Sequence, residues 1–297
     1  MTNSPIFVTG TQRSGTTLLC RILECSSQIW ALNEIYPLHS LVFDQHKNVE
    51  QKFAAELQHF FPNHTLTKPA VSTEDRFKSL VSALEESAED AGKPRWCLKD
   101  PRTTYYLNDY ASRVRNGSFV ILVRDPRAVC RSYLDQRGFT VGRPANWIAA
   151  AERWRTEIEM QLEFANANPE TTLIVRYESL IEDFTETLQS ICTHLGIPNE
   201  PALANYYRNS TDIGVHEGNA NIMSAPSKSI AEKWKEALTE RQISTVESIA
   251  KDLMLTLDYP AIKPHRPIKA THKWIAKLHD RVSREVRWQK HKWLRAQ

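Results

Sequence analysis

A glycine-spaced turn between an apolar run and a helical segment is the first feature of this sequence that could do chemistry. The run Ile6 to Thr9 leads into Gly10-Thr11-Gln12-Arg13-Ser14-Gly15-Thr16-Thr17, and Leu18 to Leu23 then has a helical pattern. A strand, a tight turn and a helix N-terminus bring unpaired backbone N–H groups to one point, which favours an anion. The spacing is that of a phosphate-binding P-loop, but Thr16 replaces its lysine, and Arg13 is the only cation. The alternative is a tight turn that binds nothing.

Two more cations stand where apolar runs end. Lys99-Asp100-Pro101 follows Trp96 to Leu98, and Arg124-Asp125-Pro126 follows Phe119 to Val123. Asp at an N-cap and Pro at the first helical position mark the start of a helix. Both cations are therefore expected at the carboxyl edge of a sheet, where α/β proteins bind their ligands.

Ser132 comes eight residues after Arg124. On a helix over 126–134 it lies two turns in, on the face that can approach the same anion as Arg124. Simple ion pairs are the alternative: Arg124 with Asp125, and Lys99 with Asp100 or Asp109. The position of Lys99 at a strand end favours a functional role.

Short apolar runs that alternate with helical patterns are typical of a parallel sheet flanked by helices. The expected strands are Ile6–Thr9, Ile29–Leu32, Trp96–Leu98, Phe119–Val123 and Leu173–Val175. Helices are expected in an insertion over about 36–91 with a break at Phe61-Pro62-Asn63, at 144–166, at 183–194 and from about 229 to 255, and 208–228 reads as a loop. The sequence predicts an α/β fold of the P-loop type, with three layers around a central parallel sheet.

Composition limits the classes of protein. At 297 residues and 41% hydrophobic the chain can bury a substantial core, and we predict one domain over 1–262. No basic leader with a long apolar run begins the chain, and no run of about 18 apolar residues occurs, so neither a signal peptide nor a membrane span is expected. The five cysteines lack the paired spacings of a zinc site. We expect a cytoplasmic protein without a bound metal.

The last 35 residues differ from the rest in charge. Residues 263–297 carry +9 of a total of +3, so the remainder carries −6 and does not favour nucleic acid. The apolar residues of this segment, with spacings of four and seven, are Trp274, Leu278, Val282, Val286 and Trp293. We predict a basic amphipathic helix; such a helix can lie on an anionic membrane surface or hold an acidic acceptor. The pattern favours the other interpretation, in which the apolar stripe docks on the domain or on a partner chain.

The motifs resemble those of sulfotransferases that use 3′-phosphoadenosine-5′-phosphosulfate (PAPS), and the nearest resemblance, over about 5–260, is to tyrosylprotein sulfotransferases. Its carriers are Gln12 to Thr17, Asn33-Glu34, Cys97 to Pro101, Val123 to Asp125, Val175 to Glu178, Lys233-Trp234 and Asp258 to Pro260. The resemblance implies that Arg13, Ser14, Gly15, Thr16 and Thr17 bind the 5′-phosphosulfate, that Arg124 and Ser132 bind the 3′-phosphate, and that Tyr177 and Lys233 contact the nucleotide. It also implies that Glu34 is the catalytic base, that Lys99 acts at the transferred group, and that a loop over about 218–227 closes over the nucleotide.

Sulfuryl transfer needs in-line positioning and cations where charge develops on oxygen, and Arg13, Lys99 and the loop amides could supply this without a metal. The acceptor hydroxyl must also lose a proton to a base. Glu34 ends the short run from Ile29 and is the first candidate; the alternatives are an ordinary exposed carboxylate there and His39 as the base. Trp234 is as easily a core residue as a neighbour of the adenine.

Several positions depart from the tyrosylprotein sulfotransferase pattern. Cys97 faces Ala31 where that family has a disulfide partner, and Tyr36 and Ser40 stand where it has arginines for acidic peptides. The acceptor hydroxyl therefore stays open among carbohydrate, lipid, small metabolite and peptidyl tyrosine. Two other functions compete: a P-loop kinase or NTPase, disfavoured by Thr16, and a non-catalytic nucleotide-binding protein, disfavoured by Glu34 together with Lys99. The expected product of the donor is adenosine-3′,5′-bisphosphate.

Overall fold

Five parallel strands form the centre of the molecule. The computed structural model describes residues 4–44, 46–66, 68–135, 142–208, 224, 225, 227–264 and 266–295, with no side chains beyond 290. The strand order is β2-β3-β1-β4-β5, and every neighbouring pair is parallel. The strands are β1 (Ile6–Gly10), β2 (Ile29–Asn33), β3 (Arg95–Lys99), β4 (Ser118–Val123) and β5 (Thr172–Arg176).

Both faces of the sheet are buried under helices. Successive side chains of the central strands point to opposite faces, so each strand contributes to both cores. In β1, Phe7 packs into the core on one face, whereas Ile6 and Val8 pack into the core on the other. All three side chains are fully buried. The apolar runs of the sequence are therefore continuous rather than alternating, as parallel strands between two helical layers require.

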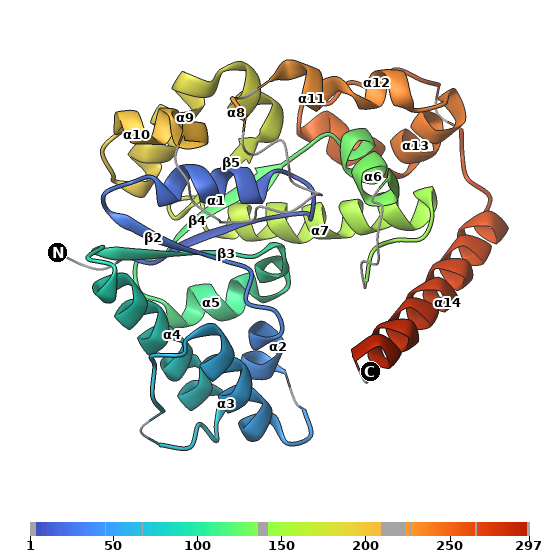
Figure 1. The fold of residues 1–297 in the computed structure, drawn as a ribbon. Coiled ribbons are helices and arrows are strands. Elements are labelled where there is room, and N and C mark those ends of the chain that lie inside the picture. The colour runs from blue at the N-terminus through green and yellow to red at the C-terminus, as the bar shows by residue number, and fades with distance from the viewer. Residues whose placement is uncertain are drawn as a thin grey trace.

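Helices cover both faces of the sheet (Figure 1). One layer contains α1 (Thr16–Glu24), α8 (Tyr177–Glu182), α9 (Phe184–Leu195) and α10 (Pro201–Ala204). The other contains α2 (Leu38–Phe43), α3 (Val49–Phe60), α4 (Thr73–Asp90), α5 (Leu107–Arg113), α6 (Pro126–Asp135), α7 (Trp147–Ala167) and α13 (Glu240–Thr256). The remaining described helices are two 3-10 turns, Pro101–Tyr106 and Tyr206–Arg208, with α11 (Lys228–Glu232), α12 (Trp234–Ala237) and α14 (Ala270–Arg295).

This arrangement confirms the predicted α/β fold with three layers. Each expected strand is present, and its bounds differ from the prediction by two residues or fewer. The helical insertion is also present, and α3 ends at Phe60, next to the expected break at Phe61. Most of the loop expected over 208–228 lies outside the described residues.

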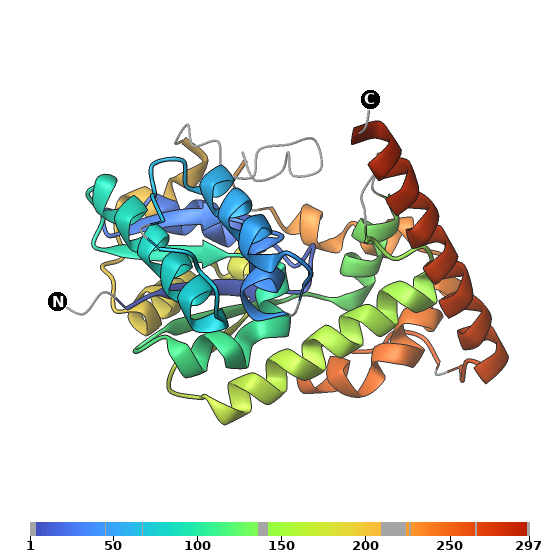
Figure 2. The same cartoon turned by 90° about the horizontal axis from the view of Figure 1, so that it is seen from below.

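The basic C-terminal segment forms one long helix, α14, which stands apart from the sheet and contacts α7 (Figures 1 and 2). Polar contacts attach it: the Ala145 amide donates to Asp280 Oδ1 at 2.7 Å, and Asn146 Nδ2 donates to the Ala276 carbonyl at 2.9 Å. The boundary between a domain over 1–262 and an extension over 263–297 remains a prediction.

Candidate functional site

The glycine-spaced turn connects β1 to α1 at the carboxyl edge of the sheet. Arg13 (φ 75°) and Gly15 (φ 94°) both adopt left-handed backbone conformations, and the Ser14 amide donates to the Thr11 carbonyl at 3.0 Å. The amides of Leu18 and Leu19 both donate to the Gly15 carbonyl. The amides of the first helical residues, including Thr16 and Thr17, have no acceptor within the helix. They are therefore the donors that an anion would use.

Gly15 is required by a close contact with Tyr177. A Cβ atom at residue 15 would lie 2.3 Å from Tyr177 Cδ2, so no larger residue fits without displacing the ring. The Arg124 guanidinium also contacts Tyr177 and lies 4.1 Å from the centroid of its ring. Burial raises the pKa of Tyr177 against the opposing effect of Arg124, so the phenol is held neutral. Tyr177 thus joins two sequence motifs that are far apart in the chain.

Arg13, Arg124 and Ser132 also meet. Arg13 Nε donates to Ser132 Oγ at 2.9 Å, and Arg124 Nη1 donates to the Arg13 carbonyl at 3.0 Å. Burial lowers the pKa of Arg13, and the charge of Arg124 lowers it further. Two partly buried guanidinium groups that repel each other form a site that an anion would stabilise.

The ion pair of Arg124 with Asp125, considered as an alternative, does not form. The Asp125 carboxylate instead accepts from its other basic neighbour, Arg127, with Nη2 to Oδ2 at 2.7 Å. Asp125 Oδ1 also accepts from the Arg127 amide at 2.8 Å, which is the expected N-terminal cap of α6. Arg124 is therefore available to another anion.

Three buried polar atoms in this region have no hydrogen-bond partner among the described residues: Thr11 Oγ1, Ser14 Oγ and Arg124 Nε. Buried polar groups are almost always paired in folded proteins. Two donors of the predicted phosphate sites are among these atoms, so the site suits a phosphorylated ligand.

Lys99 and Glu34 form the second part of the site. Lys99 Nζ donates to Glu34 Oε1 at 2.6 Å and to Asn33 Oδ1 at 2.9 Å. The Lys99 side chain is 1% exposed, whereas that of Glu34 is 49% exposed. Lys99 pairs with neither Asp100 nor Asp109, the two alternatives, since the structure gives its ion pair to Glu34.

Strand register explains why these residues meet. Lys99 lies opposite Val8 of β1 on one side and opposite Asn33 of β2 on the other. The phosphate-binding turn starts two residues after Val8, and Glu34 follows Asn33 directly. Glu34 has a φ of 57°, and its amide donates to the Lys99 carbonyl at 2.7 Å. Its carboxylate is thus fixed beside the lysine, next to the phosphate-binding turn.

His39 has a structural environment. It is 1% exposed, with Nδ1 2.8 Å from Tyr110 Oη and Nε2 3.1 Å from Asp100 Oδ2. Burial alone would raise the pKa of Asp100, but the charge and hydrogen bond of His39 and the Arg102 amide outweigh it and lower that pKa. Both ring nitrogens of His39 are engaged, so Glu34 is the better placed of the two candidate bases.

Lys233 is not joined to the rest of the site. It is exposed at the junction of α11 and α12, and within the described residues no hydrogen bond or ion pair connects it to the phosphate-binding turn or to Arg124. Its neighbour Trp234 is 4% exposed beneath the Arg127 guanidinium, at 4.1 Å, which favours a core role. Most of the predicted closing loop over 218–227 lies outside the described residues.

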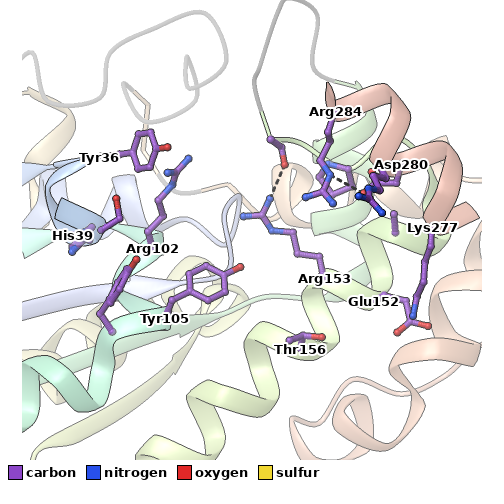
Figure 3. A pocket seen from close by; sticks show the side chains of 16 residues that line it. Tyr36, His39, Arg102, Tyr105, Glu152, Arg153, Thr156, Lys277, Asp280 and Arg284 are labelled. Atoms are coloured by element: carbon purple, nitrogen blue, oxygen red, sulfur yellow. Dashed lines mark hydrogen bonds and ion pairs between the residues drawn. The ribbon is translucent and has the colours of Figure 1, made fainter. Parts of the chain in front are cut away.

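A cavity of about 880 Å³ is lined from Tyr36 onward, two residues after Glu34, and was not predicted from the sequence (Figure 3). Glu34 itself is not one of its lining residues. Tyr36 lies at one side, with the Arg102 guanidinium 3.3 Å from the centroid of its ring. Residues of α7 and α14 form the opposite side. The sequence signals were present in Arg102, next to the Lys-Asp-Pro motif, and in the basic residues of α14, but only the fold brings them together.

The apolar stripe of α14 is not docked on the domain. Trp274, Leu278, Val282 and Val286 are between 47% and 65% exposed, and Ile275 beside them is 56% exposed. This result excludes docking on the domain for these four stripe residues. The side chain of Trp293 lies outside the described residues.

The described residues contain neither a candidate membrane span nor a candidate metal-binding cluster. None of the helices there is long and apolar enough to cross a membrane. No group of three or more His, Cys, Asp or Glu side chains lies close enough together there to hold a metal ion. All five cysteines are free thiols, and the register pairs Cys97 with Ala31.

Similarity to known sequences agrees with the site. Two relatives are a Caenorhabditis briggsae protein with the provisional name protein-tyrosine sulfotransferase, 25% identical over 87% of this chain and 91% of its own, and human carbohydrate sulfotransferase 2, 26% identical over 66% and 40%. A protein-tyrosine sulfotransferase of Drosophila melanogaster is 24% identical over 68% of this chain and 40% of its own. The relatives thus include sulfotransferases named for different acceptors.

Solved structures support the fold. The sulfotransferase domain of the Synechococcus PCC 7002 olefin synthase superposes with a TM-score of 0.56 at 21% identity, over 84% of this chain and 96% of that domain. The sulfotransferase domain from the curacin biosynthetic pathway gives 0.53 at 21% identity, over 85% and 98%. The model of the sulfotransferase family matches residues 5–201, which contain the phosphate-binding turn, Glu34, Lys99, Arg124, Ser132 and Tyr177. This chain therefore belongs to the sulfotransferase family.

Proposed function

We propose that this chain transfers the sulfuryl group of PAPS to an acceptor hydroxyl, with Glu34 as the general base. The observation that supports the proposal is that the phosphate-binding turn and the pair of Lys99 and Glu34 follow neighbouring strands at one edge of the sheet. The turn with Arg13 and Gly15 meets Arg124 through Tyr177, and Lys99 with Glu34 lies directly beside it.

The donor would use two anion sites. The helix amides of the turn, with Ser14, Thr16, Thr17 and Arg13, suit the 5′-phosphosulfate. Arg124 and Ser132 suit the 3′-phosphate, the group that distinguishes PAPS from ATP. The Arg124 Nε–H group has no acceptor among the described residues and could donate to this phosphate. Lys233 would reach the nucleotide only if it moved toward the site. No residue of the site requires a metal for this binding.

The reaction would proceed by in-line displacement. The acceptor oxygen forms a bond to sulfur while the bond from sulfur to the bridging phosphate oxygen breaks, and adenosine-3′,5′-bisphosphate leaves with the electron pair. The acceptor proton passes to the Glu34 carboxylate. Lys99 and Arg13 stabilise the charge that develops on the sulfuryl and bridging oxygens.

Lys99 and Glu34 must separate for this step. In their contact at 2.6 Å, the Lys99 ammonium occupies Glu34 Oε1, the oxygen that would otherwise face an acceptor proton. A bound phosphosulfate offers Lys99 a second anion, because the lysine lies between β1, which leads to the turn, and β2, which leads to Glu34. Donor binding would draw the ammonium toward the sulfuryl group and release the carboxylate to accept a proton.

The first test is calorimetric titration with adenosine-3′,5′-bisphosphate, beside ATP and AMP, in EDTA. We expect tight binding of the bisphosphate alone, because its 3′-phosphate pairs with Arg124. A preference for ATP that returns with magnesium would support the kinase or NTPase alternative instead. Bisphosphate binding without turnover of any acceptor would support a non-catalytic protein.

Cytoplasmic location also remains a prediction.

A further inference from the structure

The cavity lined by Tyr36, which follows Glu34 by two residues, lies between the sheet edge and α14. Tyr36 and Ser40, from the segment after Glu34, line one side of it, together with Arg102, which comes three residues after Lys99. Figure 3 shows Tyr36 and Arg102 on one side, Arg153 of α7 between, and Lys277, Asp280 and Arg284 of α14 on the other. An acceptor bound here would present its hydroxyl on the side of Glu34.

The cavity wall is strongly basic. Five cations line it, Arg102, Arg153, Lys277, Arg281 and Arg284, against two carboxylates, Glu152 and Asp280. Both carboxylates are already paired: Glu152 with Lys273 at 3.0 Å, and Asp280 with Arg284 at 3.0 Å.

Three of the cations, Arg102, Lys277 and Arg281, have no ion pair among the described residues, and Arg102 instead lies over the Tyr36 ring. Among the described residues, neither Lys277 nor Arg281 has a carboxylate within ion-pair distance, and both are exposed on α14. Arg153 is held by Glu157 Oε1 at 2.8 Å and by the Gly142 carbonyl at 3.1 Å. The wall therefore has unpaired positive charge on its α14 side, and an anionic group would be attracted there.

The remaining lining suits the body of a small molecule. Tyr36, Tyr105 and Tyr106 supply aromatic surface on the side of the sheet edge. The volume of about 880 Å³ lies within the range of small-molecule sites. Arg102 is stacked on Tyr36 on the sheet-edge side, whereas Lys277 and Arg281 lie on the α14 side. The cavity would therefore orient a molecule with its hydroxyl toward the sheet edge and its acid toward α14.

The α14 wall is fixed rather than loosely attached. The buried Asp280 accepts from the Ala145 amide, Arg287 Nη2 donates to the Arg143 carbonyl at 2.7 Å, and Lys273 pairs with Glu152. These contacts anchor α14 at three points seven residues, or about two turns, apart. The basic face can therefore select a ligand by its charge.

We propose that this cavity is the acceptor site and that it selects acceptors carrying an acidic group remote from the hydroxyl, with Lys277 and Arg281 as specificity residues. The inference rests on the proposed function and adds to it the class of acceptor. It also assigns α14, which lies beyond the residues matched by the family model, to substrate recognition.

Binding of matched probe pairs tests the proposal without turnover. The pairs are 3-(4-hydroxyphenyl)propionate with its primary amide, and glucose 6-phosphate with glucose, titrated by ligand-observed NMR in the presence and absence of adenosine-3′,5′-bisphosphate. We expect at least one acid to bind about tenfold more tightly than its neutral partner, since a charge-assisted hydrogen bond has about that effect. The pair that shows the preference tells a carboxylate site from a phosphate site.

Variants on one helix supply the control. Lys277→Gln with Arg281→Gln should reduce the preference to about twofold or less, because screened residual charge contributes little. Lys290→Gln removes an exposed cation of α14 that does not line the cavity, and should leave it unchanged. Equal binding of acid and neutral partner in both pairs, or a preference that survives the double variant, would overturn the proposal. Failure of the parent protein to bind the bisphosphate would instead overturn the donor site.

Discussion

The proposed donor side and the proposed acceptor side of this molecule are built differently. The donor side consists of short turns held by the sheet: the turn after β1, the start of α6 after β4 and the start of α8 after β5. Its residues touch one another directly, as in the contacts of Tyr177 with Gly15 and Arg124. Backbone geometry therefore fixes the donor side almost completely.

The acceptor side is assembled from elements that are distant in the sequence. Tyr36, Arg102, Arg153 and Arg281 come from four different segments. Tyr36 and Arg102 contact each other, and the cavity lies between this pair and Arg281 of α14. A common donor needs one geometry, whereas acceptors differ between sulfotransferases. The difference in construction explains how the donor side can stay constant while the acceptor side changes.

The largest expected effect is a loss of turnover without a loss of donor binding. Glu34→Gln should lower turnover by about two orders of magnitude or more, because the amide cannot accept the acceptor proton. Binding of adenosine-3′,5′-bisphosphate, measured by calorimetry, should change little. An unchanged rate would exclude Glu34 as the base and make His39→Asn the next variant to assay.

Arg124→Ala should act on the other side of the comparison. Loss of the charged partner of a partly desolvated phosphate should weaken bisphosphate binding by about a hundredfold. Affinity for AMP, which lacks the 3′-phosphate, should fall much less. Arg115→Ala, at an exposed site far from the turn, is the control. Equal affinity in Arg124→Ala and the parent would show that the 3′-phosphate binds elsewhere.

The donor side could be predicted from the sequence because its signals are local. A glycine at 15, a cation at the end of β4 and an aspartate before proline each specify a turn within a few residues. Glu34 and Lys99 needed one further inference, that parallel strands end at the same edge. Register in β2 and β3 was not readable from the sequence, yet it decides that Lys99 pairs with Glu34 rather than with Asp109.

The acceptor cavity could not be predicted because it depends on tertiary placement. The charges of α14 were visible, but the angle at which α14 crosses α7 was not. The apolar stripe also indicated docking on the domain as one alternative, whereas Asp280 and the backbone of α14 make the attachment through polar contacts. Periodicity identifies the faces of a helix, and it does not say which face meets the protein.

Asp100 links the two sides and should show a pH-dependent effect on stability. Its carboxylate accepts from the Ile35 amide at 3.0 Å and the Arg102 amide at 2.8 Å, and His39 Nε2 lies 3.1 Å from its Oδ2. The lowered pKa of Asp100 means that its contribution to stability is present above the unfolded pKa of about 3.9 and is lost as pH falls through the folded pKa. Asp100→Asn should reduce the free energy of unfolding by about 1–3 kcal/mol at pH 7.

Chemical denaturation at pH 7 and at about pH 3 measures this effect, with the exposed Asp109→Asn as control. The difference between parent and Asp100→Asn should shrink at the lower pH, because Asp100 is then largely protonated in the unfolded state and the contribution of its lowered folded pKa is being lost. A difference that stays constant with pH would mean that packing, and not the charge of Asp100, is what the substitution removes.

The smallest expected effect concerns the outer face of α14. Trp274, Leu278, Val282 and Val286 form an exposed apolar stripe on a helix rich in Lys and Arg, which is the pattern of a segment that lies on an anionic membrane surface. Each cation near such a surface contributes about 1 kcal/mol, so binding to vesicles with phosphatidylserine should be measurable by co-sedimentation and should weaken with salt. Trp274→Ser with Leu278→Ser should reduce it severalfold, whereas the cavity variants Lys277→Gln with Arg281→Gln should reduce it less, because two charges among many are lost. If both double variants reduced vesicle binding equally, the stripe would have no separate role, and the two faces of α14 could not be assigned to different partners.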